Sequence, residues 1–482
     1  MMEKALKQAV NCCLTLSTLL GNTTTLLPSS PGYESSVASY YSGQEASLRP
    51  TCIISPKTVE DVAKAVRALT SPTRPTEGNE TTCPFAIRSG GHAPAANAAN
   101  IDGGVTFDLR RLNSINVNPT ESTVSVGVGN TWDAVYAKLD ALNLSVTGGR
   151  TAGVGVGGLS LGGGMSFFGT RYGWTSDTVA NFEVVLANGS IVNANAEENP
   201  DLHWALKGGS NNFGVVTRVD LDAFEQGSFW GGALAYASNV VGDIAREVAE
   251  INSPDTYDEY AALVVSWIYE PSVGTVVSCK MAYTKLVEGP QIFDGLTSLP
   301  TLSGTLGITN ASQLAIPGKS VAGQRQYWAT NTMVSSEAAI NAAYLRFNES
   351  IPAFASIANI SFGYTIEPLP PALYARHGDM NPLGLGKNNQ SLLIGLFFAS
   401  WTDQVDDEQV DKAARGLMKA IENDSHRLGS YIPFKYLNYA ASWQDPIASY
   451  GVESVGRLRK VAREVDPHGV FTHQVPGGFK IK

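Results

Sequence analysis

The chain has 482 residues, which is more than a single hydrophobic core usually supports, so two domains are expected. Its composition, 43% hydrophobic and 16% charged, is that of an ordinary globular protein. A formal net charge of −10 argues against a nucleic-acid partner, which needs a basic field, and no apolar run approaches the length of a membrane span.

The first half of the chain alternates helical and strand patterns. A helix is predicted over 58–69, because Thr58 can act as N-cap and apolar residues follow at helical spacing. A polar, proline-containing loop is predicted over 71–82. The segments that follow are predicted as strands over 85–88, 105–109 and 124–128, and as a helix capped by Thr131 and running to about Leu142.

A hairpin signal lies further along the chain. Asn188-Gly189 separates two apolar runs, 182–186 and 190–192, and this dipeptide favours a tight turn between antiparallel strands. A short helix over 202–206 and a strand over 215–221 are predicted to close this α+β section.

The pattern changes from about Gly227. Strand-like runs over 261–267, 276–283 and 392–399 alternate with helical patterns over 337–347 and 408–421. This arrangement predicts a second domain with a mixed antiparallel sheet covered by helices.

Four of the five cysteines (Cys12, Cys13, Cys52 and Cys83) lie near the N-terminus. One or two disulfides tying down this region and free buried thiols are both open interpretations. Cys279 lies in an apolar run and is expected in the core. No pair has CxxC spacing and none lies beside a histidine, so no metal site is expected.

The signals for localisation are mixed. Residues 1–20 contain an apolar patch, but serine and threonine interrupt it and no clear cleavage site follows, so it is a poor secretory signal. One interpretation is that the sequence begins at or near a mature N-terminus. Glycosylation sequons favour the secretory route and begin at Asn22, Asn79, Asn143, Asn188, Asn310, Asn348, Asn359, Asn389 and Asn423.

A glycine-rich tract over 148–164 is the most informative segment of the sequence. It contains GxGxxG at Gly153, Gly155 and Gly158, but a Rossmann turn must follow a strand and lead into a helix. No strand is predicted before it, and the three glycines over 162–164 would cost a helix roughly 3 kcal/mol relative to alanine. The Rossmann interpretation is therefore rejected.

The same glycines argue against a hydrolase. The sequence GxSxG occurs over 158–162, but a nucleophile elbow also needs a strand before the serine and a helix after it. A chain without side chains lets successive backbone N–H groups approach an anion, so the tract favours a phosphate-bearing cofactor. The alternative is that glycine only permits close packing between strands.

Five segments together carry a family resemblance. They are Arg-Ser-Gly-Gly-His over 88–92, the glycine tract over 148–164, DLHWALKGGSNNFGVV over 201–216, YLNY over 436–439 and DPHGVF over 466–471. In this order they resemble the berberine-bridge-enzyme-like branch of the vanillyl-alcohol oxidase flavoproteins. The chain is most similar in character to the fungal members found among secondary-metabolism oxidases.

The resemblance implies a two-domain α+β fold of the PCMH type. An FAD-binding domain would comprise residues 1–226, with its core at about 46–226. A substrate domain over 227–429, an antiparallel sheet covered by helices, would be inserted before a C-terminal segment over 430–482 that returns to the FAD domain.

The resemblance also implies a set of cofactor-binding residues. In this family the 88–91 turn wraps the pyrophosphate, and His92 bonds covalently to the 8α-methyl group of the flavin. The residues expected around FAD are Arg88, Ser89, Gly90, Gly91, His92, Thr151, Val154, Gly157, Gly158, Gly162, Gly163, Asp177, Val216 and Asn438.

Three positions qualify the resemblance. Thr151 stands where many relatives have a cysteine that makes a second flavin bond, so a single link through His92 is predicted, which counts against a carbohydrate substrate. Leu396 stands where several relatives have a polar active-site group, so no carboxylate base is expected there. Val154 lies at the family's oxygen gate, where a small side chain is typical of oxidases.

The resemblance places catalysis at the YLNY motif. Tyr436 is expected to take the proton of a substrate hydroxyl as hydride leaves for the flavin, and Tyr439 is the competing candidate. The predicted function is an oxidase of a small alcohol or related carbon centre, with reoxidation by dioxygen to hydrogen peroxide. The alternatives are an oligosaccharide oxidase and a flavoprotein scaffold that steers an oxidative cyclisation.

Overall fold

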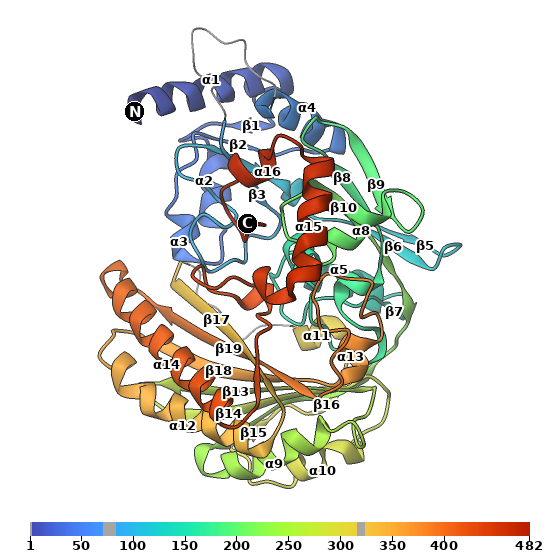
Figure 1. The fold of residues 1–482 in the computed structure, drawn as a ribbon, viewed down its shortest axis with the longest axis vertical. Helices are drawn as coiled ribbons and strands as arrows, with labels where there is room; N and C mark the ends of the chain where they lie inside the picture. Colours follow the sequence, from blue (N-terminus) through green and yellow to red (C-terminus); the bar gives the residue numbers. More distant parts are fainter. Residues whose placement is uncertain (1, 71–82, 316–322) are drawn as a thin grey trace.

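The computed structural model describes the backbone of residues 2–70, 83–315 and 323–482, and their side chains from residue 8 onward. Two layers make up the fold (Figure 1). The upper layer contains both termini and several small sheets, and the lower layer is one large sheet with helices on its outer side. The α+β fold class predicted from the sequence is confirmed.

Two small sheets form the upper layer. The strands of the four-stranded sheet, in spatial order, are β1 (Thr25–Leu26), β2 (Cys52–Ile54), β4 (Val105–Asp108) and β3 (Phe85–Arg88). Those of the five-stranded sheet are β5 (Ile115–Asn118), β6 (Thr123–Gly127), β10 (Val215–Asp222), β8 (Val179–Val185) and β9 (Ile191–Asn195). A separate pair joins β7 (Leu144–Ser145) to β11 (Phe224–Glu225). Because β3 and β4 run parallel, the loop after β3 and the loop after β4 leave the sheet at the same end.

Helices connect and cover these strands. They are α1 (Met2–Leu20), α2 (Pro31–Ala38), α3 (Gly43–Ala46), α4 (Val59–Thr70), α5 (Trp132–Asp140), α6 (Val156–Leu161), α7 (Gly169–Tyr172) and α8 (Pro200–Leu206). Helix α4 has the predicted start, since the backbone N–H of Asp61 donates to the Thr58 hydroxyl over 3.2 Å. Helix α5 begins after Thr131, whose side chain makes no capping bond, and ends two residues before Leu142.

Local sequence signals located several elements of the upper layer. Strand β3 has the predicted bounds, and β8 and β9 form the predicted antiparallel hairpin around Asn188-Gly189, with Gly189 at a φ of +77°. The polar loop predicted over 71–82 lies outside the described residues.

The glycine tract contains a helix that was not predicted from the sequence. A short helix, α6, does form, beginning after Gly155 and ending at Leu161, where the run of three glycines starts. Ser160 of the GxSxG sequence lies inside this helix and is fully buried, so it does not present a nucleophile. The helix ends after six residues, where the three glycines that were expected to disfavour a helix begin.

The lower layer is a nine-stranded sheet with antiparallel pairing throughout. Its strands are, in spatial order, β15 (Ser303–Gly304), β12 (Phe229–Ala237), β14 (Gly274–Tyr283), β13 (Ala261–Glu270), β18 (Ser361–Leu369), β19 (Leu392–Trp401), β17 (Arg325–Val334) and β20 (Tyr431–Ile432), with β16 (Gly307–Thr309) also pairing with β12. Its helices are α9 (Val241–Ile251), α10 (Asp294–Thr297), α11 (Ala311–Ala315), α12 (Glu337–Phe354), α13 (Pro371–Ala375) and α14 (Asp407–Arg427). Helices α9, α12 and α14 cover the outer face of the sheet (Figure 1).

The C-terminal segment crosses back to the upper layer. Helices α15 (Val452–Val465) and α16 (Val470–His473) lie there beside elements from the first half of the chain (Figure 1). The side chain of Asn212 donates to the Phe479 carbonyl over 2.9 Å, and that of Asn211 donates to the Gly477 carbonyl over 3.2 Å. The last residues of the chain are thus anchored to the loop between α8 and β10.

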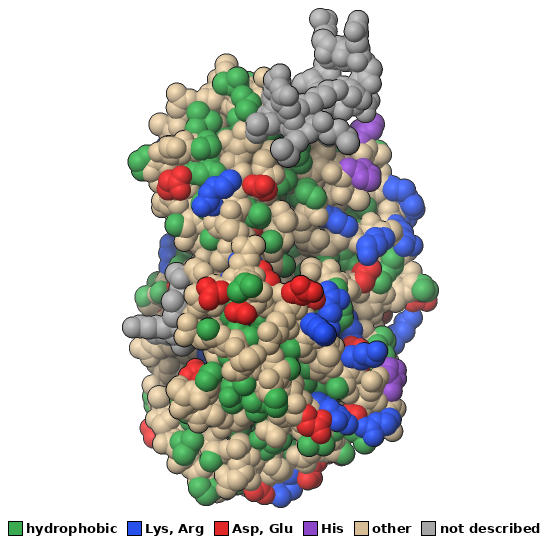
Figure 2. All heavy atoms as spheres, turned by 90° about the vertical axis from the view of Figure 1, so that its left-hand side faces the viewer, with side chains coloured by type: hydrophobic (Ala, Val, Ile, Leu, Met, Phe, Trp, Pro, Cys, Tyr) green, Lys and Arg blue, Asp and Glu red, His purple; other side chains and the backbone are tan. Residues whose placement is uncertain are grey.

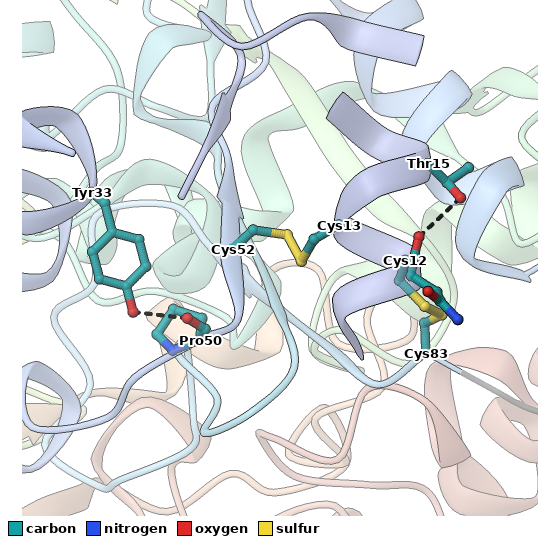
Figure 3. The surroundings of a disulfide bond; sticks show 8 residues. Cys12, Cys13, Thr15, Tyr33, Pro50, Cys52 and Cys83 are labelled. Carbon is teal, nitrogen blue, oxygen red and sulfur yellow. Dashed lines mark hydrogen bonds between the residues drawn. A yellow bond between two sulfur atoms is a disulfide. The ribbon is translucent and has the colours of Figure 1, made fainter. Parts of the chain in front are cut away.

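Both N-terminal cysteine pairs form disulfides, which decides between the two interpretations of the sequence. Cys12 bonds to Cys83 and Cys13 bonds to Cys52, so consecutive residues of α1 are joined to two different segments of the first sheet (Figure 3). Cys279 is a free, buried thiol in the core of the lower layer, as predicted.

No helix in the described part of the chain is long and apolar enough to cross a membrane. On the face of the molecule shown in Figure 2, acidic and basic side chains are interspersed among uncharged ones.

Candidate active site

A cavity of about 650 Å³ lies between the two layers. Its walls come from the loop after β3, the glycine tract, strands β17 and β19, and the C-terminal segment. The predicted site residues that line it are Ser89, Gly90, Gly91, His92, Thr151, Val154, Gly157, Gly158, Val216, Tyr436, Asn438 and Tyr439. Segments that are far apart in the sequence therefore meet at one cavity.

The loop after β3 and the glycine tract touch backbone to backbone. A Cβ atom at Gly90 would lie 2.6 Å from the Cα atom of Gly155, closer than any side chain can approach. Ser89 joins the same two segments: its hydroxyl donates to the Val128 carbonyl over 2.6 Å and accepts the Gly157 N–H over 3.0 Å. At Gly158, by contrast, a Cβ atom would meet only open space on the cavity side.

Arg88 was predicted to lie around FAD, but it does not line the cavity. Its side chain is fully buried and faces away from the cavity, towards α2. The guanidinium donates to the carbonyl groups of Ser36 and Ser39 over 2.7 and 2.9 Å and lies 3.7 Å from the ring centre of Tyr40. Arg88 thus fixes the base of the loop from behind, whereas its two neighbours, Ile87 and Ser89, line the cavity.

Gly162, Gly163 and Asp177 are further corrections, because they lie behind the cavity wall. Gly162 packs directly against the side chain of Asn438, which does line the cavity. The Asp177 carboxylate accepts the Trp174 N–H over 3.0 Å and a side-chain N–H of Asn381 over 2.7 Å, and burial raises its pKa. These residues support the wall without contacting the space inside it.

His92 stands in the cavity wall beside two aromatic rings. Its imidazole stacks on Tyr41, with ring centres 3.9 Å apart and planes 18° from parallel, and Trp328 of β17 lies 5.9 Å away. Burial lowers the pKa of His92 to about 4, while a hydrogen bond to the backbone of Gly153 acts in the opposite direction. The imidazole is therefore neutral at physiological pH, with a lone pair available for bonding.

The Tyr436 hydroxyl is held by two donors. It accepts the backbone N–H of Met165 and a side-chain N–H of Asn438, each over 3.0 Å. The ring stacks on Trp174 at 5.6 Å. Burial raises the pKa of Tyr436 to about 12, so the phenol is protonated at physiological pH.

Tyr439 has a different environment, because a carboxylate lies behind it. Its hydroxyl donates to Glu367 Oε1 over 2.9 Å and accepts an N–H of Arg150 over 3.1 Å. Arg150 also forms a buried ion pair with Glu367, whose side chain is 4% exposed. Burial and then the Glu367 charge raise the pKa of Tyr439 well above its ordinary value. A proton arriving at Tyr439 therefore has a carboxylate within one hydrogen bond.

Comparison with known proteins identifies the chain. Residues 50–195 match the model of an FAD binding domain. The chain is 33% identical over 489 residues to a protein of Cercospora beticola named FAD-dependent monooxygenase CTB5, covering 98% of this chain and 92% of that one. The chain belongs to the FAD-dependent oxidoreductase family of which this fungal protein is a member.

A second relative is longer than this member of the family. A protein of Diaporthe leptostromiformis named Oligopeptidase PhomG' is 39% identical over 473 residues. The alignment covers 97% of this chain but only 37% of that protein. The name of the relative therefore describes a protein of which this chain matches about a third.

Solved structures share the fold. The FAD-linked oxidoreductase superposes on 6-hydroxy-D-nicotine oxidase from Arthrobacter nicotinovorans with a TM-score of 0.79 at 23% identity, covering 95% of this chain and 97% of the other. Berberine bridge enzyme in complex with (S)-reticuline gives a TM-score of 0.74 at 16% identity, covering 96% and 98%. The PCMH-type fold predicted from the sequence motifs is confirmed.

The cavity of this FAD-linked oxidoreductase suits a phosphate-bearing cofactor. The glycine wall at Gly157 and Gly158 presents backbone rather than side chains, so N–H groups can approach an anion closely. His92 would lie at the flavin ring, whereas the Ser89–Gly91 turn would contact the phosphates. The FAD expected from the sequence thus fits the residues present.

Sequence reasoning missed two residues at this oxidoreductase site. Glu367 escaped notice because Leu396 of β19 occupies the aligned position, and the carboxylate comes from the neighbouring strand, β18, opposite Ile394. Its signal was a lone acid in the apolar run 361–369. Tyr41 gave no comparable signal, since it precedes every motif and meets His92 only in three dimensions.

Proposed function

We propose that this protein is an FAD-dependent oxidase with its flavin bonded covalently to His92. It removes hydride from the carbon of a small alcohol, or from a related carbon centre, in an intermediate of secondary metabolism. The observation that supports this is a single cavity with a neutral His92 in one wall and the Tyr439–Glu367 pair in another. When bound, FAD supplies the hydride acceptor and, after reduction, passes two electrons to dioxygen to give hydrogen peroxide.

The base in this proposal is Tyr439. It takes the proton of the substrate hydroxyl while its own proton moves to Glu367, to which it already donates. Arg150 contacts the Tyr439 hydroxyl and Glu367 Oε2. Its positive charge limits the build-up of negative charge as the proton passes. Tyr436 accepts hydrogen bonds from the backbone and from Asn438, which suits a role in holding the wall and orienting its neighbour.

The walls near Tyr439 favour a substrate that is less polar than a sugar. Leu396, Trp328 and Val154 line the cavity, Trp328 lies against Tyr439, and the charge of Arg150 is already paired with Glu367. Recognition of an oligosaccharide needs several free hydrogen-bonding groups aimed at its hydroxyls. The oligosaccharide oxidase and the cyclisation scaffold remain the competing functions.

The covalent link is tested without knowledge of the substrate. The purified full-length protein is precipitated with acid, and flavin is measured in pellet and supernatant. We expect yellow pellet from wild type and flavin only in the supernatant from His92→Ala. Flavin released from the wild-type protein would contradict the covalent link but not the FAD site.

The oxidase activity is tested next by oxygen consumption and hydrogen peroxide formation on a panel of aromatic and aliphatic alcohols and of oligosaccharides. Turnover of alcohols but not of sugars is the expected result. Turnover of sugars would favour the oligosaccharide oxidase, and flavin reduction without oxygen uptake would contradict the oxidase assignment.

A further inference from the structure

The segment between α2 and α3 brings a tyrosine ring onto His92. Tyr41 lies nearly parallel to the imidazole, with ring centres 3.9 Å apart, which is the closest aromatic contact of His92 in the described chain. Both side chains line the cavity. The contact joins residues 51 positions apart, and no motif of the sequence contains Tyr41.

Tyr41 is held at both ends. Its backbone N–H donates to the Gly91 carbonyl over 3.1 Å, which fixes it to the loop that bears His92. Its hydroxyl donates to Gln326 Oε1 of β17 over 3.1 Å. The ring therefore spans from the upper layer to the nine-stranded sheet.

The neighbouring residues strengthen this attachment to β17. The Gln44 side chain donates to the Gln326 carbonyl over 2.8 Å and accepts the Gln326 N–H over 3.0 Å. The Gly43 N–H donates to the Gln324 carbonyl over 2.8 Å, and a Cβ atom at Gly43 would lie 2.8 Å from the Gly323 carbonyl oxygen. The segment thus lies against β17 with no room to shift, and so the plane of Tyr41 is fixed.

We propose that Tyr41 is a positioning residue for covalent flavin attachment, holding the imidazole plane of His92 in the direction in which its nitrogen bonds to the 8α carbon. The inference rests on the covalent link proposed above. A stacked ring leaves the edge of the imidazole free while it removes rotation about the side-chain bonds, and bond formation depends on such alignment. Trp328, tilted by 49° to His92, lies beside both stacked rings, with its ring centre 5.9 Å from that of His92 and 5.8 Å from that of Tyr41.

Attachment of the flavin to His92 is an oxidation that uses dioxygen. One bond forms between an imidazole nitrogen of His92 and the 8α carbon. The nitrogen and the carbon each lose one proton, and the two electrons released pass through the flavin to dioxygen. Dioxygen takes up both electrons and two protons to give hydrogen peroxide.

The experiment measures the rate of attachment in full-length protein. Wild type, Tyr41→Leu, Tyr41→Met and Tyr41→Phe are produced as apoproteins in a riboflavin-starved host and mixed with excess FAD. Samples are denatured in acid at timed intervals, and protein-bound flavin is read by fluorescence on a denaturing gel. Tyr269→Leu, in β13 and remote from the cavity, is the matched control for loss of a tyrosine ring.

We expect Tyr41→Leu and Tyr41→Met to attach flavin about tenfold more slowly, and Tyr41→Phe to retain the rate because it keeps the stacked ring. Non-covalent affinity for FAD, measured by fluorescence quenching in a His92→Ala background, is expected to be equal with and without Tyr41→Leu. Equal affinity together with rescue by phenylalanine distinguishes positioning of His92 from a structural role.

Failure of the covalent link and failure of the role of Tyr41 give different results. If wild type itself attaches no flavin, the covalent link is wrong and this inference falls with it. If wild type attaches flavin and the folded Leu and Met variants do so at the same rate, only the role of Tyr41 is wrong. Slow attachment by Tyr41→Phe as well would overturn stacking as the cause and would point to the bond to Gln326.

Discussion

The two ends of the cavity are built on opposite principles. At the glycine end, backbone meets backbone, and the side chains that line it are small and uncharged. At the tyrosine end, the phenol of Tyr439, the carboxylate of Glu367 and the guanidinium of Arg150 form one buried hydrogen-bonded network. Added atoms should therefore damage the glycine end, whereas changes in charge or proton position should damage the tyrosine end.

The two ends also come from different parts of the chain. The glycine end joins two loops of the upper layer, at Gly90 and Gly155. The tyrosine end needs the glycine tract for Arg150, the nine-stranded sheet for Glu367 and the C-terminal segment for Tyr439. Binding chemistry thus lies within one layer, and proton chemistry lies where all three segments meet.

The largest effect is expected from Tyr439→Phe. Loss of the hydroxyl that takes the proton should lower kcat by about 10²- to 10⁴-fold, which is the usual contribution of a general base. The rate of flavin reduction is measured anaerobically by stopped flow, with the alcohol that the oxygen screen identifies. Tyr436→Phe is the matched control and should lose far less, because it leaves the Tyr439–Glu367 bond intact. A larger loss in Tyr436→Phe than in Tyr439→Phe would move the base to Tyr436.

The next effect is a loss of stability in Glu367→Gln. The buried Arg150 guanidinium would lose its carboxylate, at a cost of about 3 kcal/mol in the free energy of unfolding. Denaturant titration measures the change. Glu183→Gln, which breaks the more exposed pair with Arg218, should cost less than about 1 kcal/mol. Equal losses in the two variants would show that the deeper burial of the Arg150–Glu367 pair does not increase its contribution to stability.

A smaller effect is expected at the glycine end. Gly90→Ala forces a methyl group against the Gly155 backbone and should cost about 1–3 kcal/mol of stability, with weaker FAD binding. Gly158→Ala adds the same group to open space, so the apoprotein should keep its stability while FAD affinity falls. Thermal melting and fluorescence quenching separate the two. A stable Gly90→Ala variant would contradict the rigid contact of the two loops.

The smallest effect is the response of flavin attachment to pH. Because burial lowers the pKa of His92 to about 4, the reactive neutral imidazole predominates at every pH well above that value. The attachment rate should therefore be nearly level from pH 8 to pH 6 and fall as pH drops towards 4. Timed acid precipitation at each pH gives the profile. A rate that halves near pH 6.5 would mean that His92 titrates as an exposed histidine does.

Sequence reasoning succeeded where structure is decided locally. The start of α4 at Thr58, the bounds of β3 and the hairpin around Asn188-Gly189 depend on neighbouring residues, and all were predicted. It missed α6, a six-residue helix that contains two glycines and ends where the run of three glycines begins. The pairing of the four N-terminal cysteines could not be decided, since spacing does not determine connectivity.

The candidate site divides in the same way. Most of the residues that the motifs predicted do line the cavity. The motifs did not show which way each side chain points, so Arg88 and Asp177 were placed in the wall when they lie behind it. Glu367 and Tyr41 depend on strand register and on a contact between remote segments. Such contacts leave no periodicity in a single sequence.

The return of the C-terminal segment sets an order of events in biosynthesis. Tyr436, Asn438 and residues 476–479 line the same cavity as Tyr41 and His92. On the ribosome the last of these residues is still inside the exit tunnel when the nine-stranded sheet has already emerged. The cavity therefore closes only after residues 476–479 have left the ribosome, and cofactor loading follows that point.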